Sequence, residues 1–559
     1  MDAHKALITN IFNNSTLVEV PFFQRSYVWK EDLWGRLLED MEFVVKTKKP
    51  HFLGSIILKE GRKPRQGENF ADCRTIVDGQ QRLTTFLIFM KVLCLKLGQT
   101  ALFDCQFRIM GQMIALRHGR NDIQAFEKVM TLNKAEIIDN PEPASRIIGA
   151  FNYFVEHTQF VRIDLDADED EQQIFDTINS LGVNLTTSEL LKNYFFNRET
   201  VGEYERKWAD VFEKDDETKV YWDREIETGR IKRAIIDIFF DSYFQLFIQD
   251  KQYNISNEDK LMYSRVDRLA QSYQHFINKY CGGNKNIVLD QMKEYAECFR
   301  NNLKPNQCGM SIPKEEGIER INVVIFGLKN TTMIPYILYI AKNVQDKNEL
   351  NKMYGILESY IMRRVVVHAS TKSYNNLFTS LILNKVLDSQ TLTLRLKGIG
   401  DATTYCPDDN EMKIGFETSK LVNLQSKGII YLLESKIRSD NSSTALLGFN
   451  NYSLEHLMPK KWRNNWGACA TEDDAKKRDS LLLTLGNLAI IPQALNASIR
   501  DAAWNVKKAG KGQNKPGLLL CASGLYTLHD VLQKNDWNEH EIENRAEWLL
   551  ANAQNIWKI

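Results

Sequence analysis

The chain lacks several features that would assign its chemistry directly. Its nine cysteines are scattered, and no two of them form a CxxC pair, so paired zinc knuckles are not expected. Scattered cysteines are typical of buried free thiols in a reducing cytosol. Lys+Arg and Asp+Glu both number 72, so the net charge is zero, and no overall positive field indicates nucleic acid. Any contact with DNA must come from local basic patches.

Long uninterrupted apolar runs are also missing. The most apolar stretches, Ala234–Ile248 and Ile321–Ile340, are each interrupted by polar or charged residues. They predict buried helices rather than membrane spans. The first twelve residues have no signal-peptide architecture, so we expect a cytoplasmic protein. Internal repeats and low-complexity tracts are absent from the sequence.

The first informative stretch covers residues 17–29. A strand-like segment over Leu17–Val20 is followed by Pro21 and then by the letters FFQRSYVW. Helical periodicity begins at Trp29. An arginine flanked by aromatic residues at such a junction, here Arg25 near Tyr27, can hold an anion and stack a base. Alternatively, Arg25 pairs with a carboxylate and the aromatic residues fill the core.

A second stretch, TIVDGQQRLTTF, covers residues 75–86. The strand ends before the Asp-Gly turn, and a helix begins near Gln80. The side chains of Gln80, Gln81 and Arg82 therefore lie at a helix N-terminus, where backbone N–H groups and the helix dipole favour an anion. This is a phosphate site without a Walker-type glycine loop. Alternatively, Asp78 caps the helix and pairs with Arg82.

The third stretch runs from Tyr452 to Asn496. A short strand ends in the carboxylate–imidazole pair Glu455-His456, and a later helix carries the amide of Asn496. Carboxylate and amide oxygens are hard ligands that suit Mg²⁺ or Mn²⁺, and the neighbouring histidine can deprotonate a water molecule. Alternatively, Glu455 and His456 form a surface pair on a helix and the asparagines mark turns.

Lysines flank this third stretch on both sides. Lys460 and Lys461 follow the carboxylate–imidazole pair closely, and Lys507 and Lys508 precede a glycine-containing loop. Together they supply the local basic character that binding of a DNA backbone requires. A lysine-rich loop by itself is usually only solvated.

The N-terminal motifs resemble a known family. FQRxYxW, FLGSIIL and DGQQR occur in this order in the ParB/sulfiredoxin-like domain of GmrSD-type restriction enzymes and SspE-like defence proteins. The resemblance implies nucleotide binding and hydrolysis, with Asp78 and Arg82 at the catalytic centre. The residues that it implies for nucleotide binding are Gln24, Arg25, Tyr27, Asp78, Gln80, Gln81 and Arg82.

The C-terminal stretch resembles the HNH, or ββα-metal, nuclease motif. The resemblance implies His456 as the general base and Asn487 as the middle residue of the catalytic motif, clasping loop to strand. It also implies Glu455 and Asn496 as metal ligands. Many HNH sites have aspartate where this chain has Glu455, whose side chain is one methylene longer.

From these observations we predict an α+β, predominantly helical protein. We expect a ParB/sulfiredoxin-like nucleotide-binding α/β domain over residues 1–200, a helical connector over 201–395 and an HNH nuclease domain embedded in helices over 396–559. The length of 559 residues and the Gly-, Asp- and Thr-rich segment at 391–420 support this division.

The predicted function is a nucleotide-regulated HNH endonuclease that cuts foreign or phage DNA, modified DNA included, in bacterial defence. Its expected cofactors are Mg²⁺ or Mn²⁺ and a nucleoside triphosphate such as GTP or ATP. No membrane partner is expected, and homo-oligomerisation is left open. Two alternatives remain: a nucleotide-regulated DNA-binding sensor with an inactive nuclease-like domain, and a nuclease that targets RNA, because both nucleic acids present the same phosphate.

Overall fold

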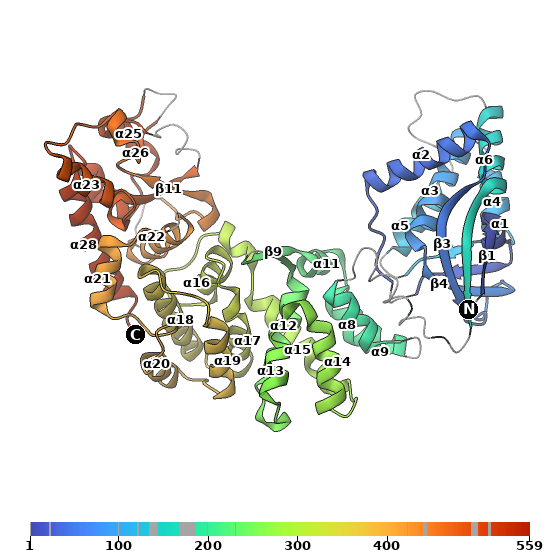
Figure 1. Cartoon of the computed structure of the whole chain (residues 1–559), viewed down its shortest axis with the longest axis horizontal. Coiled ribbons are helices and arrows are strands. Elements are labelled where there is room, and N and C mark those ends of the chain that lie inside the picture. Colours follow the sequence, from blue (N-terminus) through green and yellow to red (C-terminus); the bar gives the residue numbers. More distant parts are fainter. Residues whose placement is uncertain are drawn as a thin grey trace. The chain divides into compact units, whose positions relative to one another are not determined.

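The protein is α+β and mainly helical, as predicted. The computed structural model describes residues 2–21, 24–98, 100–119, 122–132, 144–166, 169, 174, 186–197, 200–229, 231–421, 423–439, 444–493, 501–511 and 516–559. The chain divides into two compact units, Met1–Asp215 and Asp216–Ile559, whose elements are labelled in Figure 1. A separate nuclease domain beginning at residue 396 stays a prediction.

A six-stranded mixed sheet lies at the centre of the first unit (Figure 1). The strand order is β1-β8-β3-β4-β2-β7, with antiparallel pairing only for β1–β8 and β3–β4. The strand predicted near residue 17 is confirmed as β2, and the FLGSIIL motif lies within β3. The bounds are Asp2–Leu7 (β1), Thr16–Glu19 (β2), His51–Glu60 (β3), Asp72–Asp78 (β4), Leu116–Arg117 (β7) and Thr158–Leu165 (β8).

Helix α3 (Gln80–Leu97) packs against the sheet and forms the hydrophobic core with it. On its apolar face, Leu83 and Phe86 are fully buried in one cluster with Ile56 and Ile76 of the sheet. Gly79 precedes the helix with φ +100°, a conformation that a side chain would strain. The other α-helices in the described residues of this unit are α1 (Ile8–Ile11), α2 (Glu31–Thr47), α4 (Thr100–Phe107), α5 (Ile123–Met130), α6 (Ala144–His157), α8 (Thr187–Phe195), α9 (Val201–Tyr204) and α10 (Asp210–Phe212).

The second unit begins with helices around one short hairpin, β9 (Glu225–Thr228) and β10 (Ile231–Ala234). Both apolar stretches of the sequence form buried helices, as expected: α12 (Ile235–Ile248), then α16 (Ile318–Asn322) and α17 (Ile334–Asn343). The remaining helices of this part are α11 (Asp216–Asp223), α13 (Asn257–Tyr263), α14 (Leu269–Tyr280), α15 (Asn286–Asn302), α18 (Lys347–Val366), α19 (Tyr374–Leu383) and α20 (Ser389–Lys397).

A buried ion pair ties these helices to the rest of the unit. Arg320 of α16 donates to both carboxylate oxygens of Glu358 of α18 at 2.7 Å, and to Ser435 Oγ of α22 (Asn423–Ile437) at 2.8 Å. Arg320 is fully buried. Since its donors are met by acceptors on two other helices, the guanidinium positions α22, on which the next elements pack.

The last part of the second unit is a small hairpin surrounded by helices. Strand β11 (Tyr452–His456) pairs antiparallel with β12 (Leu488–Pro492). Both strands pack against α22. The helices here are α21 (Asp409–Thr418), α22 (Asn423–Ile437), α23 (Glu472–Leu481), α25 (Trp504–Ala509), α26 (Leu518–Cys521), α27 (His529–Gln533) and α28 (Glu539–Ile556).

The described part of the chain contains no helix that could span a membrane. None of its helices combines the length and the apolar character that crossing a bilayer requires.

Candidate functional site

The carboxylate–imidazole pair lies at the end of strand β11. Glu455 is opposite Ala489 and His456 is opposite Leu488 in the antiparallel register. The order along the chain is strand, strand and then helix α25, which returns to β11 through the side chain of Lys507. The helix that was predicted to carry Asn496 lies outside the described residues, so the predicted metal-binding order stays a prediction.

Asn487 connects the turn before β12 to the loop after His456. Its side-chain oxygen accepts from the Met458 N–H at 2.8 Å and from Trp537 Nε1 at 3.1 Å, while its nitrogen donates to the carbonyls of Met458 at 2.8 Å and Leu482 at 3.0 Å. The residue is fully buried. Because every donor and acceptor of the amide is used, Asn487 holds the loop and has no capacity left for a substrate.

Glu455 is buried and paired with a buried lysine. Lys507 Nζ donates to Glu455 Oε1, and it also donates to the His456 carbonyl at 2.6 Å. Glu455 is 5% exposed and Lys507 is 0% exposed. Burial raises the pKa of the Glu455 carboxyl and lowers the pKa of the Lys507 ammonium, and each charge partly offsets the shift of the other.

His456 presents an imidazole nitrogen without a partner. Its Nε2 is buried and makes no hydrogen bond within the described residues. Burial, with added repulsion from Lys460 and Lys507, lowers the pKa of His456 to about 4. The ring is therefore neutral at pH 7, which is the form that accepts a proton.

The donor chemistry at this hairpin fits a divalent cation in part. A buried carboxylate and an orphaned imidazole nitrogen lie on adjacent residues, Glu455 and His456. Asn496, the second predicted metal ligand, lies outside the described residues. Within the ranges that the structure describes, no cluster of three or more His, Cys, Asp or Glu side chains could hold a metal, so any site here depends on an amide or carbonyl ligand as well.

The four predicted DNA-binding lysines occupy different environments. Lys460 and Lys461 are exposed just after β11. Lys508 is partly buried and donates to the Lys534 carbonyl at 2.8 Å. The placement of Lys507 does not support its predicted DNA contact, because its ammonium is enclosed against Glu455.

Sequence reasoning missed two further residues that shape the hairpin. Arg545 of α28 donates to the carbonyls of Gly486 at 2.8 Å and Leu488 at 2.7 Å, on either side of Asn487. Trp537 closes the other side through its bond to Asn487. No sequence motif around Arg545 or Trp537 indicates these contacts. An arginine on a helix usually faces solvent, so its burial was not expected.

At the N-terminal motif, most predicted nucleotide-binding side chains bond to the protein itself. Gln24 Nε2 donates to the carbonyls of Ile76 at 3.0 Å and Val77 at 2.6 Å. Gln81 accepts from the Val28 N–H at 2.9 Å and donates to the Ser26 carbonyl at 3.2 Å. These bonds fasten the segment after β2 to β4 and α3.

Tyr27 and Arg82 are engaged in the same way. The Tyr27 hydroxyl lies 2.5 Å from Thr85 Oγ1. Arg82 donates to the Ser55 carbonyl at 2.6 Å and to Asp78 Oδ2 at 3.2 Å, the pairing that the sequence left open as an alternative. Gly54, with φ +107°, leaves the room that the guanidinium occupies.

Within the described ranges, Gln80 and Arg25 are motif residues whose side chains have no hydrogen-bond partner in the protein. Gln80 is 2% exposed, and neither atom of its amide has a hydrogen-bond partner among the described residues. Arg25 is half-buried, and its guanidinium makes no hydrogen bond or ion pair with any residue that the structure describes. These two side chains retain capacity for a ligand.

Comparison with known proteins covers both regions. The model described as "GmrSD restriction endonuclease, N-terminal domain" matches residues 8–196, and that described as "GmrSD restriction endonucleases, C-terminal domain" matches residues 406–552. No curated protein matches the chain. The two matches define the class, a restriction endonuclease with paired N- and C-terminal domains. The chain belongs to the GmrSD restriction endonuclease family, as its motifs predicted.

Proposed function

We propose that this protein is a nucleotide-regulated, metal-dependent endonuclease of the HNH type that cuts foreign DNA, including DNA with modified bases or backbone. The observation that carries the proposal is the buried pair at the end of β11. There a carboxylate and a neutral imidazole with an unpartnered Nε2 lie side by side in the sequence, in a hairpin held by Asn487. The family assignment supports cleavage of DNA.

In the proposed mechanism His456 acts as the general base. Its Nε2 accepts a proton from a water molecule as the water oxygen forms a bond to phosphorus, and the bond from phosphorus to the leaving oxygen breaks. The low pKa of His456 keeps the ring in its proton-accepting form at pH 7. Asn487 fixes the loop that follows the base, so the imidazole keeps one orientation.

Glu455 and Asn496 would hold Mg²⁺ or Mn²⁺. When bound, the ion supplies positive charge that stabilises the phosphate as charge develops on it. Lys507 keeps the Glu455 carboxylate charged and in place inside the protein. Lys460, Lys461 and Lys508 are proposed to contact the DNA backbone.

The N-terminal unit is proposed to bind and hydrolyse a nucleoside triphosphate. Asp78 and Arg82 remain the proposed catalytic residues, while Arg25 and Gln80 are the motif side chains with capacity for the ligand. Nucleotide binding can control cleavage only if it favours one arrangement of the protein energetically. An Arg82→Ala protein with undiminished nucleotide turnover would contradict this part.

The nuclease part is tested by plasmid cleavage with Mg²⁺ or Mn²⁺, with and without each nucleotide. We expect His456→Ala to lower the cleavage rate roughly 100- to 10,000-fold, the usual contribution of a general base. His529→Ala, which alters an exposed histidine of the same unit, is the matched control and should cleave like the wild type. Wild-type nicking by His456→Ala would remove the mechanism. Cleavage of tRNA but not DNA would favour the RNA alternative, and binding without cleavage would favour the sensor.

A further inference from the structure

A hollow of about 490 Å³ lies in the first unit beside the N-terminal motif. The loop between β3 and β4 forms one wall, and the ends of β2 and β7 form another. Glu19 of β2 lies directly opposite Arg117 of β7 in the sheet register, so the sheet itself places both residues here. We call it the basic hollow, and its polar lining residues are Glu19, Arg62, Arg65, Thr75, Arg117 and His118.

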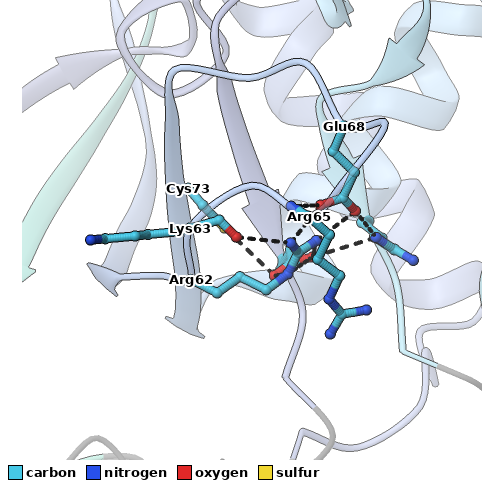
Figure 2. A network of polar contacts seen from close by, with 7 residues as sticks. Arg62, Lys63, Arg65, Glu68 and Cys73 are labelled. Carbon is cyan, nitrogen blue, oxygen red and sulfur yellow. Dashed lines mark hydrogen bonds and ion pairs between the residues drawn. The ribbon is translucent and has the colours of Figure 1, made fainter.

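Glu68 organises the arginines around this hollow. Its carboxylate accepts from Arg62 at 2.5 and 2.8 Å, from Arg117 Nη1 at 2.9 Å and from the Arg65 backbone N–H at 2.9 Å (Figure 2). The hydrogen bond from Arg62, the largest influence, helps to lower the pKa of Glu68 to about 2. The carboxylate is therefore ionised at any physiological pH and anchors the loop to β7.

The arginines Arg62, Arg65 and Arg117 differ in how many of their side-chain N–H donors already have an acceptor. Arg62 uses all its nitrogens on Glu19, Glu68 and the Lys63 carbonyl. Among the residues that the structure describes, Arg117 has acceptors only for Nη1. Figure 2 shows the Arg65 side chain extending away from the network, and its guanidinium has no acceptor among the described residues.

The charge of the hollow is positive. Two of the three guanidinium charges are balanced by Glu19 and Glu68, and one remains. His118 adds no charge at pH 7, because burial lowers its pKa to about 4. The residue is only 4% exposed, and its buried Nδ1 has no hydrogen-bond partner among the described residues. The lining thus contains a second polar group that lacks a protein partner.

These groups match the chemistry of a phosphate. Arginine recognises phosphate oxygens through parallel N–H bonds, and its donors retain their direction when a carboxylate holds the side chain. The volume is within the range of small-molecule sites. His118 also links the hollow to the DGQQR helix, because its Nε2 lies 3.1 Å from Thr84 Oγ1 of α3.

We propose that the basic hollow binds the phosphate groups of a phosphorylated small molecule, with Arg65 and Arg117 as the direct donors. That the molecule is a nucleotide rests on the proposed nucleotide regulation, whereas phosphate recognition rests on the hollow alone. Arg62 and Glu68 then position the loop and do not touch the ligand.

The test is calorimetric titration of the full chain with inorganic pyrophosphate, ATP and GTP at one fixed ionic strength. Arg65→Ala should weaken binding about tenfold or more, because it removes charge-assisted hydrogen bonds. Arg117→Lys, which keeps the charge and loses the fork, should also weaken binding. The matched control is Lys63→Ala in the same loop, whose side chain points elsewhere (Figure 2) and whose loss should change affinity by less than about twofold.

The outcomes separate this inference from the proposed function. Binding of pyrophosphate but not of nucleotides would support the hollow and contradict nucleotide regulation. Nucleotide binding that is lost in Arg25→Ala or Arg82→Ala, yet unchanged in Arg65→Ala and Arg117→Lys, would overturn the hollow and leave the regulation standing. Equal weakening by Lys63→Ala and Arg65→Ala, or no binding of any probe, would overturn it as well.

Discussion

The two regions that carry recognisable motifs use their polar side chains in opposite ways. In the N-terminal motif, Gln24, Gln81 and Arg82 are bonded mainly to backbone carbonyls and N–H groups. At the end of β11, by contrast, His456 keeps an unpartnered Nε2 beside a buried carboxylate. A motif residue can therefore serve the fold or the chemistry, and its remaining hydrogen-bonding capacity distinguishes the two.

The same distinction applies to the arginine clusters. Arg320 in the second unit is buried and bonded to Glu358, to Ser435 and to backbone carbonyls. Arg65 and Arg117 beside the basic hollow have donors to spare. A saturated guanidinium stabilises packing, whereas an unsaturated one on the wall of a hollow is available to an anion.

The largest expected effect concerns the buried pair Glu455–Lys507 at the end of β11. Lys507→Met leaves the Glu455 carboxylate buried and unpaired, so we expect the free energy of unfolding of the second unit to fall by about 3–5 kcal/mol. Urea unfolding measures it. Adding Glu455→Gln should recover part of the loss. Lys508→Met, on the same helix, is the control and should cost much less; equal stability of Lys507→Met and the wild type would disprove the internal pairing.

A smaller effect is expected at the N-terminal motif. Gln24→Ala removes the donor to two buried carbonyls, so it should destabilise the first unit by about 1–3 kcal/mol and weaken nucleotide binding only through that loss. Arg25→Ala should leave stability within about 0.5 kcal/mol and still weaken nucleotide binding. Thermal unfolding and nucleotide titration on both variants measure this. A Gln24→Ala protein of native stability that fails to bind nucleotide would place Gln24 in contact with the ligand.

A third expected effect, which is gradual and develops only as the pH falls, is a pH dependence of the first unit. His118 has a folded-state pKa of about 4 against an ordinary 6.5, so the unfolded chain binds the proton first as pH falls. The stability that neutral His118 contributes is complete above pH 6.5. Between pH 6.5 and pH 4 the free energy of unfolding falls by at most about 1.4 kcal/mol for each pH unit. Unfolding of wild type and His118→Asn at pH 7, 6 and 5 should give a flatter profile for the variant, and parallel profiles would contradict the assignment.

Much of the fold could be predicted because its signals are local. The strand near residue 17, the helix that starts at Gln80 and the buried helices of the two apolar stretches all follow from periodicity and turn residues within a few positions. The short strand that ends in Glu455-His456 was predicted in the same way. Family membership followed from short motifs in a fixed order.

By itself, the sequence determined the elements, the two motif regions and the family to which the chain belongs. Only the tertiary structure decided which polar side chains have their hydrogen-bonding capacity filled by other protein groups and which retain some of it. Lys507 meets Glu455 across 52 positions of sequence, and Arg117 meets Glu68 across 49. Such long-range contacts depend on how separate elements pack against one another. No local sequence pattern encodes the burial that pairs Lys507 with Glu455, or the exposure that leaves donors of Arg117 available.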